Sequence, residues 1–188
     1  MLIAVLHFAA RHSDDGLLTP SSLLGIMEPL RFHHFDGRTT QLLDANGQEQ
    51  GRLTYTGAFR TKAEVLTREG VYTIQRKGIS GVCVLFNDHP VVKLHVRWSG
   101  PTELNDTARP ERSLVLKQPS IWRNLHELLD EQGHVHARIT SSYNWRTWRT
   151  EHSLSVQSDQ EPPGAVMLLT AVYALDAKRR RHSAAAVG

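Results

Sequence analysis

Apolar and polar residues alternate along most of the middle of the chain. The clearest stretch is VVKLHVRW at residues 91–98, where every second residue is apolar: Val92, Leu94, Val96 and Trp98. Period-two alternation of this kind is typical of strands with one buried face. Turn-forming pairs such as Asn46-Gly47 and Lys77-Gly78 separate the apolar runs. From Met27 to about Gln157 the pattern therefore predicts many short strands joined by turns, as in a sandwich or a barrel.

A thirteen-residue pattern occurs twice, 86 residues apart. The stretch LLDANGQEQGRLT at 42–54 aligns without a gap with LLDEQGHVHARIT at 128–140. In each copy an Asp opens a turn, a Gly at positive φ would close it, and a strand follows. The small residues Gly51 and Ala137, at the same place in both copies, predict a face packed closely against something inside. The repetition predicts two similar halves, at about 27–98 and 113–157.

The most apolar stretch of the chain, Gly164–Leu175, is followed by its densest basic run, Lys178–Arg181. Twelve residues are too few to cross a bilayer, for which a helix needs about 20. Pro162-Pro163 suits a helix start, and the basic run suits the negative end of a helix. Because apolar residues cover every side, the segment predicts a helix over about 163–181 that is enclosed by protein. No transmembrane span is expected.

The first 26 residues are expected to form a loosely attached N-terminal extension. Leu2–Phe8 is apolar, but no Lys or Arg precedes it and His7 interrupts it, which argues against a signal peptide. Arg11–Gly25 is polar and rich in turn-forming residues. A single compact domain is therefore expected over 27–188, and Met27 is a candidate for the natural start.

Charge and cysteine content narrow the class of protein. The chain has 188 residues, about one domain, and a formal net charge of +3 at pH 7. Dedicated nucleic-acid-binding proteins concentrate Lys and Arg far more strongly, so nucleic acid is not an expected partner. Cys83 is the single cysteine, so no intramolecular disulfide can form. This cysteine content indicates a cytoplasmic protein.

The repeated LLD-x-x-G pattern, followed by the terminal AVMLLTAVYALDAKRRR at 165–181, resembles the tubby C-terminal-like superfamily. The likeness is strongest to its LURP-one-related and phospholipid-scramblase-like branches and covers roughly Met27 to His182. It implies a closed antiparallel barrel of about twelve strands, built from two similar halves, with a hydrophobic C-terminal helix through its centre. No lipid-binding residue carries over from the family to this chain.

Sequence motifs of catalysis and cofactor binding are missing from the chain. It has no G-x-S-x-G elbow, P-loop, dinucleotide fingerprint or H-E-x-x-H. Cys83 lies in the apolar run VCVLF, where a buried, inert thiol is the expected state. His134 and His136 have a spacing that suits a metal, but Gln48 and Gln50 replace them in the other copy of the repeat. We therefore expect no enzymatic activity, no cofactor and no metal.

Four basic residues on expected outward strand faces are the candidate ligand-binding residues: Arg52, Lys93, Arg97 and Arg138. If they converge, they would form an anion site for a phosphorylated headgroup, because Arg contacts phosphate through two hydrogen bonds. The run Lys178–Arg181 would either add attraction to an anionic membrane or simply cap the helix.

The expected function is that of a non-enzymatic intracellular barrel that binds acidic phospholipid headgroups or a protein partner, cytoplasmic or peripheral at a membrane. Two alternatives stay open beside it. One is a lipocalin-like small-molecule carrier. A helix that fills the lumen argues against it, because such a helix would leave no room for an apolar ligand. The other is an uncatalogued enzyme, which needs a cleft that gathers titratable groups from both halves.

Overall fold

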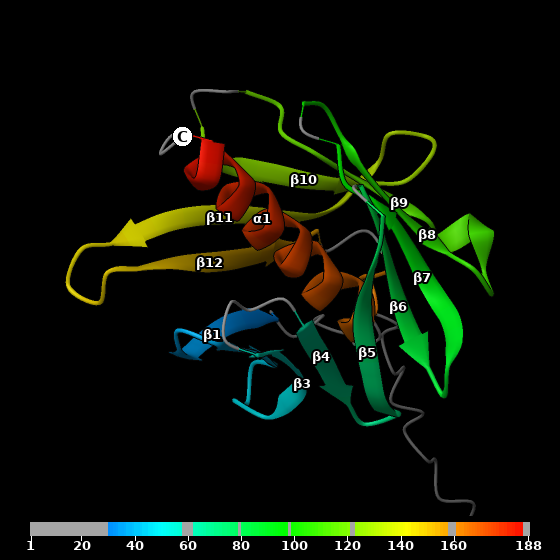
Figure 1. Ribbon diagram of the computed structural model, residues 1–188, viewed down its shortest axis with the longest axis horizontal. Coiled ribbons are helices and arrows are strands. Elements are labelled where there is room, and N and C mark those ends of the chain that lie inside the picture. The colour runs from blue at the N-terminus through cyan, green and yellow to red at the C-terminus, as the bar shows by residue number, and fades with distance from the viewer. Residues whose placement is uncertain are drawn as a thin grey trace, which may run out of the picture.

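The computed structural model describes residues 30–57, 62–78, 80–97, 99–120, 123–157 and 161–185 (Figure 1). Within these ranges it contains twelve strands, a short 3-10 helix and one long helix: β1 (Arg31–Asp36), β2 (Thr39–Leu43), β3 (Glu49–Thr56), β4 (Lys62–Thr67), β5 (Gly70–Lys77), β6 (Gly81–Phe86), β7 (His89–His95), β8 (Thr102–Asp106), η2 (Pro110–Arg112), β9 (Leu114–Lys117), β10 (Leu125–Leu129), β11 (Val135–Asn144), β12 (Arg149–Val156) and α1 (Ala165–Ala185). The expected N-terminal extension with its boundary at Met27, and Trp98, lie outside the described residues.

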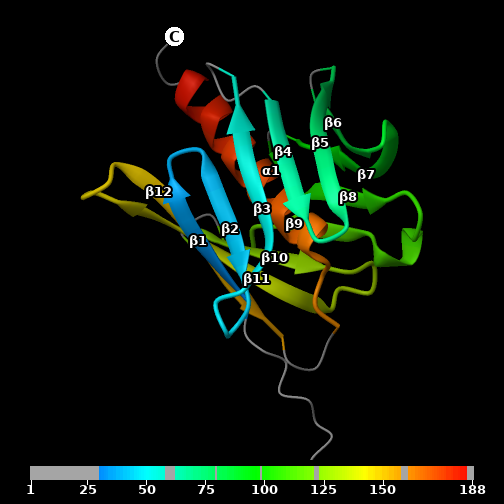
Figure 2. The ribbon, with the colours of Figure 1, turned by 90° about the horizontal axis from the view of Figure 1, so that it is seen from below.

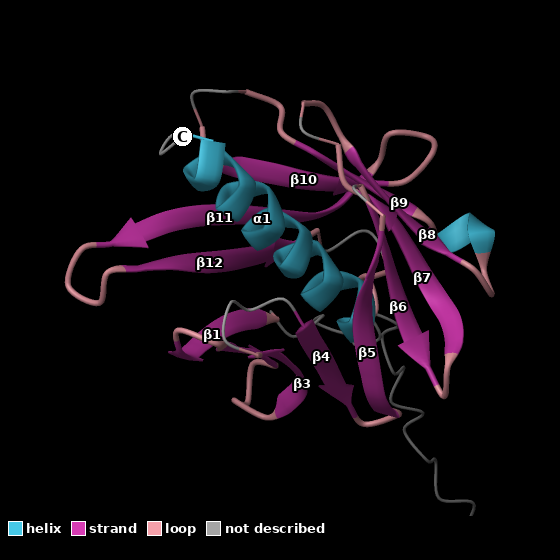
Figure 3. Cartoon of the chain, viewed as in Figure 1, coloured by secondary structure: helices cyan, strands magenta, loops and turns pink. Residues whose placement is uncertain are grey.

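The strands form one antiparallel sheet whose spatial order follows the chain from β1 to β12. This sheet curls around α1 into a nearly closed barrel, as Figure 3 shows by secondary structure. The two ends of the sheet, β1 and β12, contact each other at the seam. The prediction of a mainly β, twelve-stranded antiparallel barrel with a C-terminal helix is confirmed.

The alternation seen in the sequence corresponds to the two faces of the sheet. In β7 and the residue that follows it, Val92, Leu94 and Val96 are at most 3% exposed. Between them, Lys93 and His95 are exposed to solvent. The same alternation recurs in β4 and in β3, so one face of the sheet lines the core and the other meets water.

The two copies of the repeated pattern form hairpins with matching hydrogen bonds. The hairpins are β2–β3 and β10–β11, and each ladder contains one register shift. The backbone N–H of Gly47 donates to the carbonyl of Asp44, and that of Gly133 to the carbonyl of Asp130, both at 3.1 Å. Both glycines have positive φ, 78° and 87°. The shared Asp and Gly therefore produce the same turn twice.

Gly51 lies where β3 approaches the central helix most closely. A Cβ atom at this position would be 3.0 Å from Cδ1 of Leu169 and 3.1 Å from the carbonyl oxygen of Leu66. Its counterpart in the second copy, Ala137, is fully buried. The prediction of a closely packed face at these small residues is confirmed.

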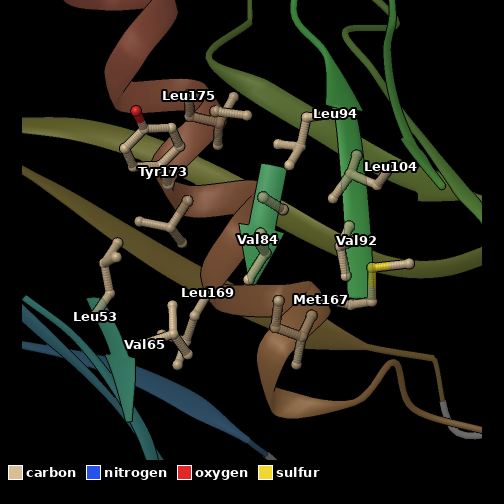
Figure 4. Close-up of a cluster of buried hydrophobic side chains, with 14 of the residues drawn as sticks. Leu53, Val65, Val84, Val92, Leu94, Leu104, Met167, Leu169, Tyr173 and Leu175 are labelled. Carbon is tan, nitrogen blue, oxygen red and sulfur yellow. The ribbon is translucent and has the colours of Figure 1, made fainter. Parts of the chain in front are cut away.

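The helix α1 begins two residues later than predicted and extends past 181 to Ala185. Its residues from Met167 to Ala177 are buried, except that Asp176 is partly exposed. Side chains of β3, β4, β6, β7 and β8 converge on it in the core of Figure 4. Figure 2 shows β1 to β4 lying across one side of the helix. Within the described residues, no helix is both long and apolar enough to cross a membrane.

Candidate functional site

The four basic residues selected from the sequence do not lie together in the folded chain. Three of them pair with a carboxylate: Arg52 with Glu49 at 2.7 Å, Arg97 with Glu103 at 3.0 Å and Arg138 with Glu127 at 3.0 Å. Lys93 is exposed on β7. These four positions are spread over β3, β11 and the region of β7, and they line neither of the cavities described below.

A different set of basic residues meets at the end of the barrel where α1 ends. A cavity of about 320 Å³, which we call the arginine cavity, is lined there by His34, Asp36, Gly37, Arg38, Thr39, Thr40, Tyr55, Tyr143, Trp148, Arg149, Thr150, Asp176, Arg179, Arg180 and Ser183. Its lining comes from the β1–β2 hairpin, Tyr55 of β3, the β11–β12 hairpin and the last turns of α1. Closing the barrel therefore brings together residues that are far apart in the sequence.

Four guanidinium groups line the arginine cavity. Arg38 and Arg149 are exposed at its rim, and Arg179 and Arg180 come from the helix. The guanidinium of Arg180 lies 4.9 Å from the ring centre of Tyr55, and that of Arg179 lies 5.4 Å from the ring centre of Tyr143. Among the described residues, no carboxylate forms an ion pair with any of these four arginines.

Exposed aromatic side chains stand beside the arginine cavity. The β11–β12 hairpin extends away from the barrel on the left of Figure 1. Its tip carries Trp145 and Trp148, which are 72% and 73% exposed and whose rings meet edge to face at 6.1 Å. Asn144 Oδ1 accepts from the backbone N–H groups of Arg146 and Thr147 and so fixes this turn.

Below the arginines, a buried polar network joins the helix to the seam of the barrel. Asp176 accepts from the hydroxyl of Tyr55 at 2.7 Å and lies 3.3 Å from Nε2 of His152. The backbone N–H of His152 donates to Nε2 of His34 at 2.7 Å, across the seam from β12 to β1. Asp176, which ends the apolar stretch of the helix, therefore connects α1 to both β3 and β12.

The network perturbs the titration of its members. Burial by itself would raise the pKa of Asp176, but the hydrogen bond and charge of His152, the hydroxyl of Tyr55 and the charge of Arg180 outweigh it, and the pKa is lowered. Burial and the proximity of His152 lower the pKa of His34. A neutral His34 is also what the geometry needs, because its Nε2 accepts a hydrogen bond.

Ser141, His152 and Asp176 have the residue types of a hydrolytic triad. Ser141 Oγ lies 2.9 Å from Nδ1 of His152. A nucleophile must meet its substrate in a cleft, however, and Ser141 is not among the residues that line the arginine cavity. The arrangement instead holds a buried imidazole between the sheet and the helix.

The histidines of the second repeat hold a carboxylate. Oδ2 of Asp130 lies 3.1 Å from Nδ1 of His134 and 3.2 Å from Nε2 of His136. Burial alone would raise the pKa of Asp130, but the backbone and side chain of His134 and the ring of His136 lower it to about 2. Within the described part of the chain, no group of three His, Cys, Asp or Glu side chains is arranged to hold a metal ion.

A second cavity lies at the opposite end of α1. This helix-start cavity has a volume of about 720 Å³ and is lined by residues that include Gly164–Met167 of the helix. The expectation that a helix filling the lumen leaves no room for an apolar ligand concerns the middle of the barrel and stays a prediction. The helix fills the middle of the barrel and leaves a hollow beside its first turn.

Sequence reasoning missed the arginine cavity because its members are separated by more than a hundred residues. Arg38 lies in a turn, Arg149 follows the hairpin tip, and only Arg179 and Arg180 belong to a basic run that the sequence marks. A second signal was present in the stretch NWRTWRT at 144–150, where the triplet Trp-Arg-Thr occurs twice at a turn.

Comparisons of this chain with protein-family models, with curated proteins and with solved structures give no match.

Proposed function

We propose that the chain is a tubby-like, non-enzymatic barrel that binds the headgroup of an acidic phospholipid in the arginine cavity. The observation that carries the proposal is that four arginines line one hollow next to an exposed tryptophan pair, and that none of them forms an ion pair with a described carboxylate, although Asp36 and Asp176 also line the hollow. The guanidiniums outnumber the carboxylates four to two, and guanidiniums favour phosphate because they donate two parallel hydrogen bonds to its oxygens.

The surroundings of the arginines also suit a phosphate ligand. Tyr55 and Tyr143 lie against the guanidiniums of Arg180 and Arg179, which orders these long side chains before a ligand arrives. The basic groups stand at the end of α1, where the helix dipole is negative, so their charge is stabilised when the cavity is empty. A phosphate that enters then replaces water around arginines that are already in place.

Trp145 and Trp148 would anchor the protein at the surface of the membrane. Tryptophan favours the boundary between headgroups and acyl chains because it combines a large apolar ring with one polar N–H. In this arrangement the hairpin tip enters the interface while Arg38 and Arg149 reach the phosphates beside it. The protein is then a peripheral membrane protein of the cytoplasm.

Cosedimentation of the full chain with vesicles tests the proposal. Vesicles of phosphatidylcholine that also contain phosphatidylserine or a phosphoinositide should retain the protein in a salt-sensitive manner, and phosphatidylcholine alone should not. The substitution Arg149→Gln should weaken binding to anionic vesicles about fivefold, because one basic residue near an anionic surface contributes about 1 kcal/mol. Arg138→Gln is the matched control, since this arginine pairs with Glu127 and lies outside the cavity.

Two outcomes would remove lipid as the ligand. One is equal retention by neutral and anionic vesicles, and the other is no retention by either. Loss of binding to a similar extent in Arg149→Gln and Arg138→Gln would place the interaction outside the arginine cavity. If Trp148→Ala weakens retention by vesicles but not the binding of a soluble headgroup, the tryptophan acts at the interface and the arginines bind the phosphate.

A further inference from the structure

The helix-start cavity differs from the arginine cavity in having a mainly apolar wall. Its volume of about 720 Å³ lies within the range that small-molecule sites occupy, roughly 300–1,000 Å³. The wall is made of core residues and of partly buried residues packed against the core: Leu30, Leu42, Tyr72, Phe86, Val91, Val92, Leu114, Val166 and Met167. A hollow with such a wall favours an apolar molecule over water.

Charged residues surround the mouth of this cavity, and acidic ones predominate. Five carboxylates and three guanidiniums line it, which leaves a net charge of −2 when His136 is neutral: Glu69, Asp106, Glu111, Asp130 and Glu161 against Arg68, Arg109 and Arg112. Two of the arginines are already paired, Arg109 with Asp106 at 3.8 Å and Arg112 with Glu161 at 3.3 Å.

Two of the carboxylates have no cationic partner among the described residues. Glu69 accepts a hydrogen bond from the neutral hydroxyl of Tyr72 at 2.7 Å. Glu111 lies in the exposed 3-10 helix η2 and forms no ion pair with a described residue. The remaining guanidinium, that of Arg68, donates a hydrogen bond to the amide oxygen of Gln48 at 3.4 Å and forms no ion pair with a described carboxylate. The charge available to a ligand at this mouth is therefore acidic.

We propose that the helix-start cavity is a second binding site, for a small cationic amphiphile: an organic amine with an alkyl or aryl body. The apolar body would lie against Val166, Met167 and the strand residues of the wall. The ammonium group would stay at the mouth, where Glu69 and Glu111 supply carboxylates that form no ion pair. This site lies at the other end of α1 from the arginine cavity and does not depend on headgroup binding there.

Calorimetric titration of the full chain with decylamine, decanol and decanoate tests the site. The three probes share one apolar body and differ in the charge of the head. Decylamine should bind saturably with one molecule per chain, decanol about tenfold more weakly, and decanoate most weakly, because the mouth repels a carboxylate. The preference for the amine should shrink at high salt.

Two pairs of variants locate the site. The double substitution Glu69→Gln and Glu111→Gln should weaken the binding of decylamine about tenfold and leave the binding of decanol unchanged. Glu64→Gln with Glu131→Gln removes the same charge from exposed positions that do not line the cavity, and should change neither probe. Val166→Phe fills the cavity and should abolish binding of both probes, whereas Val115→Phe, outside the cavity, should not.

Thermal unfolding of each variant establishes that the barrel is intact, and Val91→Phe replaces Val166→Phe if the latter unfolds. The proposal is overturned if decylamine fails to bind saturably, if decanoate binds as well as decylamine, or if an intact cavity-filled variant binds as the parent does. Arg149→Gln should bind decylamine as the parent does, so the outcome here is separable from that of the vesicle experiment.

Discussion

The two ends of the barrel are built around one helix, yet they differ in charge and in lining. At the end of α1, four arginines and two carboxylates surround a cavity of about 320 Å³. At its start, five carboxylates and three arginines surround a larger hollow with an apolar wall. The charge that predominates at each end is opposite in sign to the helix dipole there, which stabilises the predominant groups closest to α1.

The comparison shows how an enclosed helix can give a barrel two unlike ends. The dipole favours basic groups at one end and acidic groups at the other, whatever ligand each end binds. Charge alone is therefore weak support for a ligand. What distinguishes the arginine cavity from a simple helix cap is that Arg38 and Arg149 come from the sheet, away from the last turn of α1.

The largest effect is expected from the middle of the helix, which both ends share. Leu169 is fully buried, and Leu169→Asp places an unpaired carboxylate inside the barrel. We expect it to lower the free energy of unfolding by several kcal/mol, a large part of a typical domain's 5–15 kcal/mol. Urea unfolding followed by circular dichroism measures this. A cooperative transition close to that of the parent would mean that α1 does not fill the core.

Asp176→Asn should affect only the end of the barrel that holds the arginines. The substitution removes the negative charge that His152 and Tyr55 share. We expect the free energy of unfolding to fall by about 2 kcal/mol, because two buried groups lose a charged acceptor. Decylamine binding at the other end should be unchanged in the folded variant. If the folded variant also loses decylamine binding, the two cavities are coupled.

Mildly acidic pH should destabilise the same end of the barrel through the protonation of His126. Burial and the charge of Lys178 lower the pKa of His126 to about 4, from its ordinary 6.5. As the pH falls below 6.5, His126 takes up a proton in the unfolded chain before it does so in the folded chain. The free energy of unfolding therefore decreases as the pH is lowered. With allowance for its partial exposure, we expect a loss of about 1 kcal/mol between pH 7 and pH 5.

Urea unfolding of His126→Gln at the two pH values measures this contribution. The variant should lose less stability on acidification than the parent. His34, whose pKa is also lowered, acts in the same direction and should account for part of the remaining slope. An identical pH dependence in the parent and the variant would contradict the account.

The smallest effect is expected at the paired arginines of the outer face. Arg52→Gln and Arg138→Gln each remove one partner of an exposed ion pair. Such pairs contribute about 0–1 kcal/mol, so the free energy of unfolding should change little. Retention by anionic vesicles should also stay close to that of the parent, which separates these arginines from those of the cavity.

Local patterns in the sequence predict the fold well because each is decided by neighbouring residues. Alternation predicts β7, the Asp and Gly of each repeat predict its turn, and apolarity on every side predicts α1. The cavities depend instead on contacts across the barrel. Arg38 meets Arg149 only once β1 and β12 come together, and the hollow beside Val166 depends on where the strands leave the helix uncovered.

Ion pairing explains why the arginines selected from the sequence differ from those that line the arginine cavity. An outward position on a strand does not reveal whether a carboxylate lies opposite on the next strand. Arg138 faces Glu127 across the β10–β11 ladder, and Arg97 bonds Glu103 on β8. Their positive charge is therefore partly neutralised before any ligand arrives, whereas Arg149 forms no ion pair with a described carboxylate and interacts with Asp36 only at longer range.

The most direct test is to locate a soluble headgroup on the full chain by nuclear magnetic resonance. Titration with an inositol polyphosphate should shift the backbone amide signals of the β1–β2 turn, the start of β12 and the last turns of α1. The signals of Glu49–Arg52 and Glu127–Arg138 should stay in place. Shifts centred on those hairpins, or none at the arginine cavity at saturating ligand, would contradict the account.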